Sequence, residues 1–71
     1  MKEKIKQLEE YLENDDFENI DNFLHEIYSF WYDDVEISKI DDILTEATLY
    51  IEFKEAEYKE EALKLINIFL D

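Results

Sequence analysis

The 71-residue sequence contains no cysteine, no glycine, no proline and no arginine. Without cysteine the protein can form neither disulfides nor thiolate metal sites, and it has no thiol nucleophile. Without glycine it lacks the phosphate-binding loop, the dinucleotide-binding fingerprint and the usual calcium-binding loop. Without arginine it has no bidentate clamp for a phosphate. These absences exclude several common classes of nucleotide, metal and thiol chemistry.

The missing glycine and proline also bear on the fold. β-Hairpins and tight loops depend on glycine, proline and Asn-Gly pairs, so this chain is expected to consist of helices joined by short polar turns. No stretch approaches the roughly 18 apolar residues of a membrane span. The lysine-rich start is followed by Gln7-Leu8-Glu9-Glu10 where a signal peptide would have its apolar region, so we expect a cytoplasmic protein.

Apolar residues recur at helical spacing in the first half of the chain. A first helix is expected over about residues 2–13, with Ile5, Leu8 and Leu12 on one face. Residues 14–16, an Asn-Asp-Asp cluster, end it and cap a second helix over residues 16–32. The buried stripe of that second helix, which Tyr28 joins, follows steps of three and four residues: Phe17, Ile20, Leu24, Ile27 and Trp31.

In the second half, Ser38 and Asp41 form a capping box that predicts the start of a third helix. Residues 48–53 are rich in strand formers, so one strand of an α/β protein is the alternative there. A fourth helix is expected over residues 54–70, unless the third and fourth are one bent helix. The fold class predicted for residues 1–71 is all-α: a single domain, built as a compact antiparallel bundle of three to four short helices.

Negative charge dominates what the sequence does contain. There are 21 acidic residues against seven lysines, for a formal net charge of −14. Between Gln7 and Phe53 the only lysine is Lys39, against 15 carboxylates. A proteome rich in Glu, Asp, Lys, Ile and Asn is the alternative explanation, but that bias would raise lysine together with glutamate. Such a surface repels nucleic acid and anionic lipid and attracts basic proteins.

The polar residues favour a protein that is not an enzyme. Ser29 or Ser38 could pair with His25, but Ser29 lies on an exposed arc and nothing indicates an oxyanion hole. His25-Glu26 begins like a zinc-protease motif, yet Ser29 stands where the second histidine belongs. His25 is interpreted as a helix-flank residue, with a pH sensor as the alternative. Adjacent carboxylates fit caps and solvated faces, so we expect no metal and no cofactor.

The candidate partner-binding surface lies around the turn after the second helix. Residues 28–34 read Tyr-Ser-Phe-Trp-Tyr-Asp-Asp, and interface hot spots favour Trp and Tyr. Trp31 is expected in the core, whereas Phe30 and Tyr32 fall on opposite sides of the apolar stripe, so at least one should contact a partner. The predicted site combines these two aromatic residues with the acidic residues around them: Phe30, Tyr32, Asp33, Asp34, Glu36, Asp41 and Asp42.

In size, charge and helicity the chain resembles the small acidic, all-helical immunity proteins of bacterial toxin systems, although it shares no residue motif with them. The resemblance implies an inhibitor that occludes the active site of a cognate basic toxin of the nuclease or tRNase type, as a monomer within a heterodimeric complex. A phage-type anti-defence protein or DNA mimic is a close alternative. A regulatory or structural homodimeric bundle is the second class, although the charge opposes self-association.

Overall fold

Four α-helices and one π-helical turn make up the part of the chain that the computed structural model describes, which is the backbone of residues 2–31 and 37–71 and the side chains of residues 2–29 and 40–71. In chain order these elements are α1 (Lys2–Glu13), α2 (Phe17–Glu26), the π-helical turn η1 (Ile27–Trp31), α3 (Ile37–Phe53) and α4 (Ala56–Leu70). The all-α prediction is confirmed, and the first helix has the bounds that the sequence predicts.

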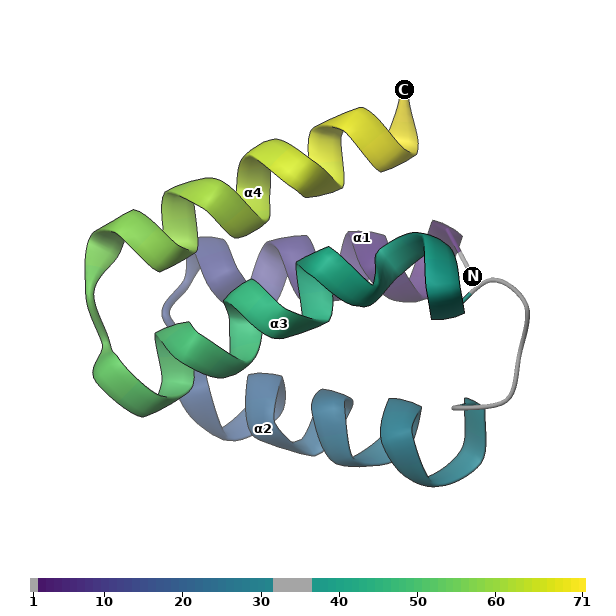
Figure 1. Cartoon of the computed structure of the whole chain (residues 1–71). Helices are drawn as coiled ribbons and strands as arrows, with labels where there is room; N and C mark the ends of the chain where they lie inside the picture. The colour runs from purple at the N-terminus through teal and green to yellow at the C-terminus, as the bar shows by residue number, and fades with distance from the viewer. Residues whose placement is uncertain (1, 32–36) are drawn as a thin grey trace.

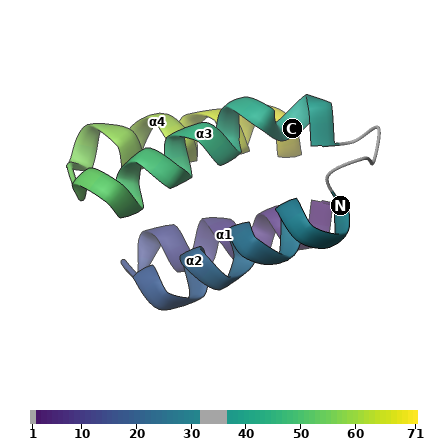
Figure 2. The ribbon, with the colours of Figure 1, turned by 60° about the horizontal axis from the view of Figure 1, so that its bottom comes forward.

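The helices form two antiparallel hairpins that pack as two layers. Figure 2 shows the α1–α2 hairpin as one layer and the α3–α4 hairpin as the other. Each helix packs against its neighbour in sequence, and α1 also packs against α4, which closes the ring. Figure 1 shows the longest helix, α3, running between α4 and α2. Because α1 and α4 cover the opposite side, the outer junction of α2 and α3 stays open to solvent.

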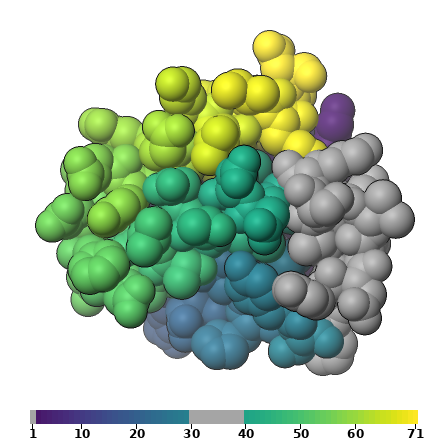
Figure 3. Space-filling model, in the orientation of Figure 1, coloured from purple at the N-terminus to yellow at the C-terminus, as the bar shows by residue number. Residues whose placement is uncertain are grey.

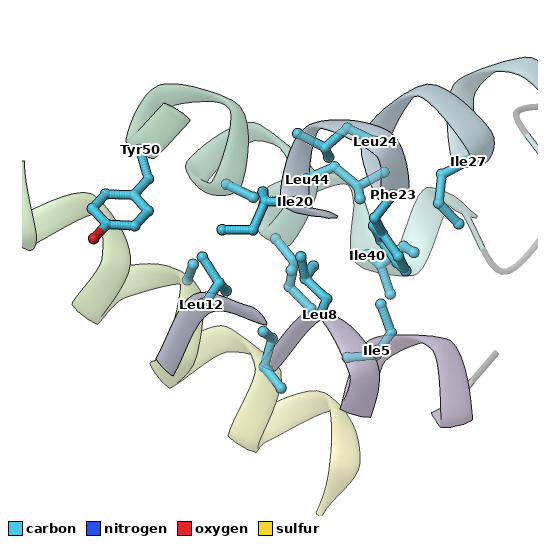
Figure 4. Close-up of a cluster of buried hydrophobic side chains, with 14 residues drawn as sticks. Ile5, Leu8, Leu12, Ile20, Phe23, Leu24, Ile27, Ile40, Leu44 and Tyr50 are labelled. Atoms are coloured by element: carbon cyan, nitrogen blue, oxygen red, sulfur yellow. The ribbon is translucent and has the colours of Figure 1, made fainter. Parts of the chain in front are cut away.

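One apolar cluster fills the space between the layers (Figure 4). Every helix contributes to it at the three- and four-residue spacing that turns one helix face inward. No polar or charged side chain is buried among the described residues. The 14 buried residues are Ile5, Leu8, Leu12, Ile20, Phe23, Leu24, Ile27, Ile40, Ile43, Leu44, Ala47, Tyr50, Ala62 and Ile66.

The turn between α1 and α2 is a Schellman motif completed without glycine. The Asp16 amide donates to the Tyr11 carbonyl at 2.9 Å and the Asp15 amide to the Leu12 carbonyl at 3.2 Å. Asp15 itself has φ +54°, in the left-handed region that glycine normally occupies. Asp16 then caps α2, because its carboxylate accepts from the Asn19 amide. The predicted capping role of this acidic cluster is confirmed.

Two side chains from the other hairpin hold Asp15 in place. The Tyr50 hydroxyl donates to its Oδ1 at 2.5 Å in a partly buried hydrogen bond, and the Lys59 ammonium donates to the same oxygen at 2.9 Å. Donation from Tyr50, and next from Lys59, lowers the pKa of the Asp15 carboxyl. Burial, helped by the bond to Asp15, raises the pKa of Tyr50 to about 12. The Tyr50 ring also packs against Phe17 at 5.2 Å, so one residue of α3 joins both ends of this turn.

The end of the second helix differs from the sequence prediction. Regular α-helix stops at Glu26, and Ile27–Trp31 continue as a π-helical turn. Hydrogen bonds in a π-helix reach one residue further than in an α-helix, so the helical period changes at this point. Tyr28, which was predicted to join the buried stripe, lies in this turn and is 40% exposed.

Three further sequence predictions can be compared with the observed helices α3 and α4. α3 begins at Ile37, so Ser38 lies in its first turn, and the prediction that Ser38 caps it is wrong. Residues 48–53 are helical, so the strand alternative is wrong too. α3 and α4 are separate helices: Lys54 has φ +56° and Glu55 is extended, and this two-residue connection reverses the chain. The left-handed residue turns the chain out of α3, as glycine commonly does.

Candidate functional site

The predicted site residues are only partly within the described chain. Tyr32, Asp33, Asp34 and Glu36 lie outside the described residues, and for Phe30 the structure describes only the backbone, in η1. The two remaining residues, Asp41 and Asp42, are exposed near the start of α3.

Asp41 and Asp42 do not share one face of α3. The helical period places Asp41 on a stripe with Thr45, Thr48 and Glu52, on the flank turned toward α2. Asp42 falls about 100° further round the helix, on its solvent-exposed side. Because the other acidic residues of the predicted site lie outside the described residues, Asp41 and Asp42 are the two carboxylates of that site that the structure places. Asp41 belongs to the flank that leads to the groove described next.

An open groove of about 380 Å³ lies between α2 and α3. Figure 3 shows the face on which the atoms of α3 lie between those of α4 and α2. From α2 and η1 the groove is lined by Asp21, Leu24, His25, Tyr28 and Ser29. From α3 it is lined by Thr48, Ile51 and Glu52. Two of these residues come from η1, and π-helical turns occur frequently at functional sites.

The groove has an apolar floor between two acidic walls. Leu24 is buried and Ile51 is partly buried, and the ring of Tyr28 extends this apolar surface toward solvent. Asp21 lies on the α2 wall and Glu52 on the α3 wall. A depression with an apolar floor and opposed carboxylates accommodates a side chain or helix face that is apolar along its length and cationic at its edge.

His25 is the one basic group that lines the groove. Its Nδ1 lies 2.9 Å from the Asp21 carbonyl oxygen, to which a proton on that nitrogen donates, and 3.6 Å from the Asp21 carboxylate. Its side chain is 75% exposed. When His25 is neutral, the walls carry only the two carboxylates. Glu52 has no ion-pair partner among the described residues, so its charge faces solvent.

Three lysines with described side chains are engaged away from the groove. Lys4 pairs with Glu26 at 3.0 Å and ties α1 to α2 on their far side. Lys59 pairs with Asp15 at the α1–α2 turn. Lys54 lies with its ammonium 5.1 Å from the centre of the Phe17 ring, beyond the Asp21 end of the groove. These contacts hold the cations at helix junctions and leave the α2–α3 face predominantly anionic.

The groove offers little support for catalysis. His25 and Ser29 both line it, one helical turn apart, but His25 is so exposed that water would screen any charge developing in a transition state. Within the described part of the chain, no group of three or more His, Asp or Glu side chains is placed to hold a metal ion. None of the described helices is long and apolar enough to cross a membrane.

Other surface features are smaller or isolated. A second depression, of about 180 Å³, lies between α1 and α2 and is lined largely by polar side chains, among them Gln7, Asn19 and Asn22. Phe53 and Ile68 are exposed large apolar residues, at 57% and 65%. Phe53 packs against Tyr58 at the α3–α4 turn, whereas Ile68 lies near the end of α4. The apolar side chains around Ile68 on α4, those of Leu65, Phe69 and Leu70, are partly buried against the core.

The sequence prediction missed most of the groove. It treated His25 and Ser29 only as possible catalytic or titrating residues, and it did not single out Asp21, Thr48 or Glu52. The available signal was the pairing of two antiparallel helices whose flanks carry carboxylates next to apolar residues.

A search against protein-family models, curated proteins and solved structures found no match for this chain.

Proposed function

We propose that this protein binds a basic protein partner and inhibits it, in the manner of an immunity protein that covers the phosphate-binding active site of a nuclease or tRNase toxin. Its carboxylates take the place of the phosphates that such a site is built to hold. The partner's cationic surface would supply the charges that the inhibitor lacks. Inhibition on this model needs tight occlusion and no chemistry by the inhibitor.

The observation that carries this proposal is the exposed, largely unpaired anionic surface on a rigid helical scaffold. The net charge is −14, and no charged side chain is buried among the described residues. Self-repulsion of this size costs stability in a small domain, so the charge is expected to serve a purpose outside the fold. Lys4, Lys54 and Lys59 make their contacts at helix junctions, and none of the described lysines lines the groove between α2 and α3.

A capture experiment from the native host tests the proposal. The protein is immobilised, a lysate is passed over it at low salt and again at high salt, and bound proteins are identified. We expect a basic protein with nuclease activity, inhibited on addition of this chain in equimolar amount. Recovery of acidic or neutral proteins alone, or of a nuclease that remains active when saturated, would contradict the proposal.

Association kinetics provide a second measurement. Electrostatic steering raises association rates by about 10- to 1,000-fold and is screened by salt. We therefore expect the association rate to fall at least about tenfold between roughly 0.05 M and 0.5 M salt, with a smaller change in the dissociation rate. An association rate that does not respond to salt would show that the charge does not guide binding.

Charge reversal tests the site that the sequence predicts. Replacing Asp33, Asp34, Asp41 and Asp42 with lysine is expected to weaken partner binding while the helix content measured by circular dichroism is retained. Normal binding by this variant would mean that the contact surface lies elsewhere on the chain.

Sedimentation at low and high salt distinguishes the proposed inhibitor from the homodimeric alternative. A dimer that persists in both conditions would favour the homodimer.

A further inference from the structure

We infer that the groove between α2 and α3 is the docking site for a cationic amphipathic helix of the partner. This inference rests on the proposed function and assigns it a place on the molecule. The helix would lay its apolar side chains on the groove floor and direct its lysine or arginine heads to the carboxylates of the two walls. Amphipathic helices bind hydrophobic grooves between helices in this way.

The shape and floor of the groove fit such an occupant. Its volume of about 380 Å³ is open to solvent and can take side chains from one face of a helix. Leu24 and Ile51 form an apolar base, and Tyr28 adds an aromatic ring at the edge. The other exposed large apolar residues of the described chain, Phe53 and Ile68, lie away from this groove.

The charges around the groove select a cation. Asp21 lines the groove from α2 and Glu52 lines it from α3. The helical period adds Glu18 to the same flank of α2 and Asp41 to the same flank of α3, so carboxylates continue beyond both ends. The basic side chains described nearest to these carboxylates are His25 on the α2 wall and Lys54 near Phe17. Lysine and arginine can bury their aliphatic stems on the floor while their charged heads reach these carboxylates.

The same charges disfavour other occupants. A nucleic acid or an anionic membrane would bring phosphates against Asp21 and Glu52. A second copy of this chain would bring the same acidic walls against each other, and each copy carries a net charge of −14. A basic helix is therefore the occupant whose charge complements the groove.

Thr48 and Thr45 provide a matched pair of variants for a blocking experiment. Both threonines are exposed on the same flank of α3, and each hydroxyl donates to the carbonyl four residues earlier, at 2.8 Å and 3.0 Å respectively. Only Thr48 lines the groove. Thr48→Trp places a large side chain over the groove floor, whereas Thr45→Trp adds the same side chain one turn away. Circular dichroism and thermal unfolding verify that both variants are folded.

The probe is a labelled helical peptide of leucine and lysine, with its leucines on one face, and oligolysine of equal charge is the comparison. We expect Thr48→Trp to weaken binding of the amphipathic peptide at least about tenfold, as expected when a central anchor is excluded, and Thr45→Trp to change it less than about twofold. Oligolysine should bind both variants alike. Equal effects of the two tryptophans on the amphipathic peptide would overturn the assignment of the groove.

Two double variants test whether binding depends on the charges of the groove or on the net charge of the protein. Asp21→Asn with Glu52→Gln removes two charges from the walls, and Glu57→Gln with Glu61→Gln removes two from the exposed flank of α4. We expect the first pair to weaken the amphipathic peptide by about threefold to tenfold and the second pair by less than about twofold. Equal losses of affinity in the two pairs would refute the groove as the docking site but would be compatible with the proposed function. Failure of the wild-type protein to bind either cationic probe at low salt would contradict both the docking site and the proposed function.

Backbone amide chemical shifts measured during titration with the same peptide locate the contact directly. Changes are expected to concentrate on residues 21–29 and 48–52. Changes confined to α1 and α4 would overturn the inference even if the peptide bound tightly. A dimer that forms in sedimentation and is disrupted by Thr48→Trp would assign the groove to a second copy instead, and that too would overturn it.

Discussion

Replacing Tyr50 with phenylalanine removes one hydroxyl group and leaves the aromatic ring in place. The ring is 5% exposed and packs against Phe17, so its burial is retained. What is lost is the 2.5 Å hydrogen bond to Asp15 Oδ1. A typical hydrogen bond contributes about 0.5–1.5 kcal/mol net, and one to a charged group contributes more. Because Lys59 still binds the carboxylate and water can reach it, we expect a destabilisation of about 1 kcal/mol.

For a domain of this length, 1 kcal/mol corresponds to a fall in Tm of about 4–8 °C. Thermal unfolding followed by circular dichroism at neutral pH measures it. The matched control is Tyr58→Phe, because the hydroxyl of Tyr58 has no hydrogen bond to any other described residue. That control should change Tm by no more than about 2 °C.

The pH dependence of this difference tests the stated cause. Because folding lowers the pKa of Asp15, its ionised carboxylate stabilises the fold above the ordinary carboxyl range, and this stabilisation is lost as the pH falls through the lowered pKa. The gap between wild type and Tyr50→Phe should therefore narrow in acid, where Asp15 is protonated. An equal gap at neutral and acidic pH, or no gap at neutral pH, would refute the role assigned to this hydrogen bond.

Three further predictions concern the fold. Folding raises the pKa of Tyr50 from 10 to about 12, so the stability that its neutral hydroxyl gives the fold should be intact below pH 10 and lost as the pH rises through 12. A spectrophotometric titration should show one tyrosine that ionises at higher pH than the others, and Tyr50→Phe should remove it. Asp16→Ala removes the cap of α2 and should cost about 1 kcal/mol in urea unfolding, whereas Glu18→Ala, one helical position beyond the first residue of α2, should cost less than about half of that. Leu8→Ala empties a fully buried position and should cost about 2–5 kcal/mol; a loss under 1 kcal/mol would mean that the core is less tightly packed than described.

A helix could be predicted from the sequence where apolar residues recur at helical spacing along its whole length. Ile5, Leu8 and Leu12 define the buried face of α1, and all three are buried. The acidic cluster at residues 14–16 was correctly interpreted as a turn and cap, because short carboxylates bind free amides through local contacts alone. Predictions of this kind succeed because they depend on residues a few positions apart.

The errors occur where distant residues decide the structure. Residues 48–53 have high strand propensity, yet Ala47 and Tyr50 face the core at helical spacing and burial outweighs propensity. The π-helical turn at Ile27–Trp31 was not predicted, because no local residue type is specific for such a turn. The groove was missed because its two walls come from different helices, and the sequence pattern of either helix alone does not show it.

The left-handed turn at Asp15 has a consequence for how the chain folds. An aspartate there lacks the freedom of glycine, and the groups that hold it come from residues 35 and 44 positions away in sequence. The turn of the first hairpin therefore gains these two contacts only when the second hairpin has docked on it. We expect unfolding in a single cooperative step, with no stable half-molecule, so that a partner meets either the complete scaffold or an unstructured chain.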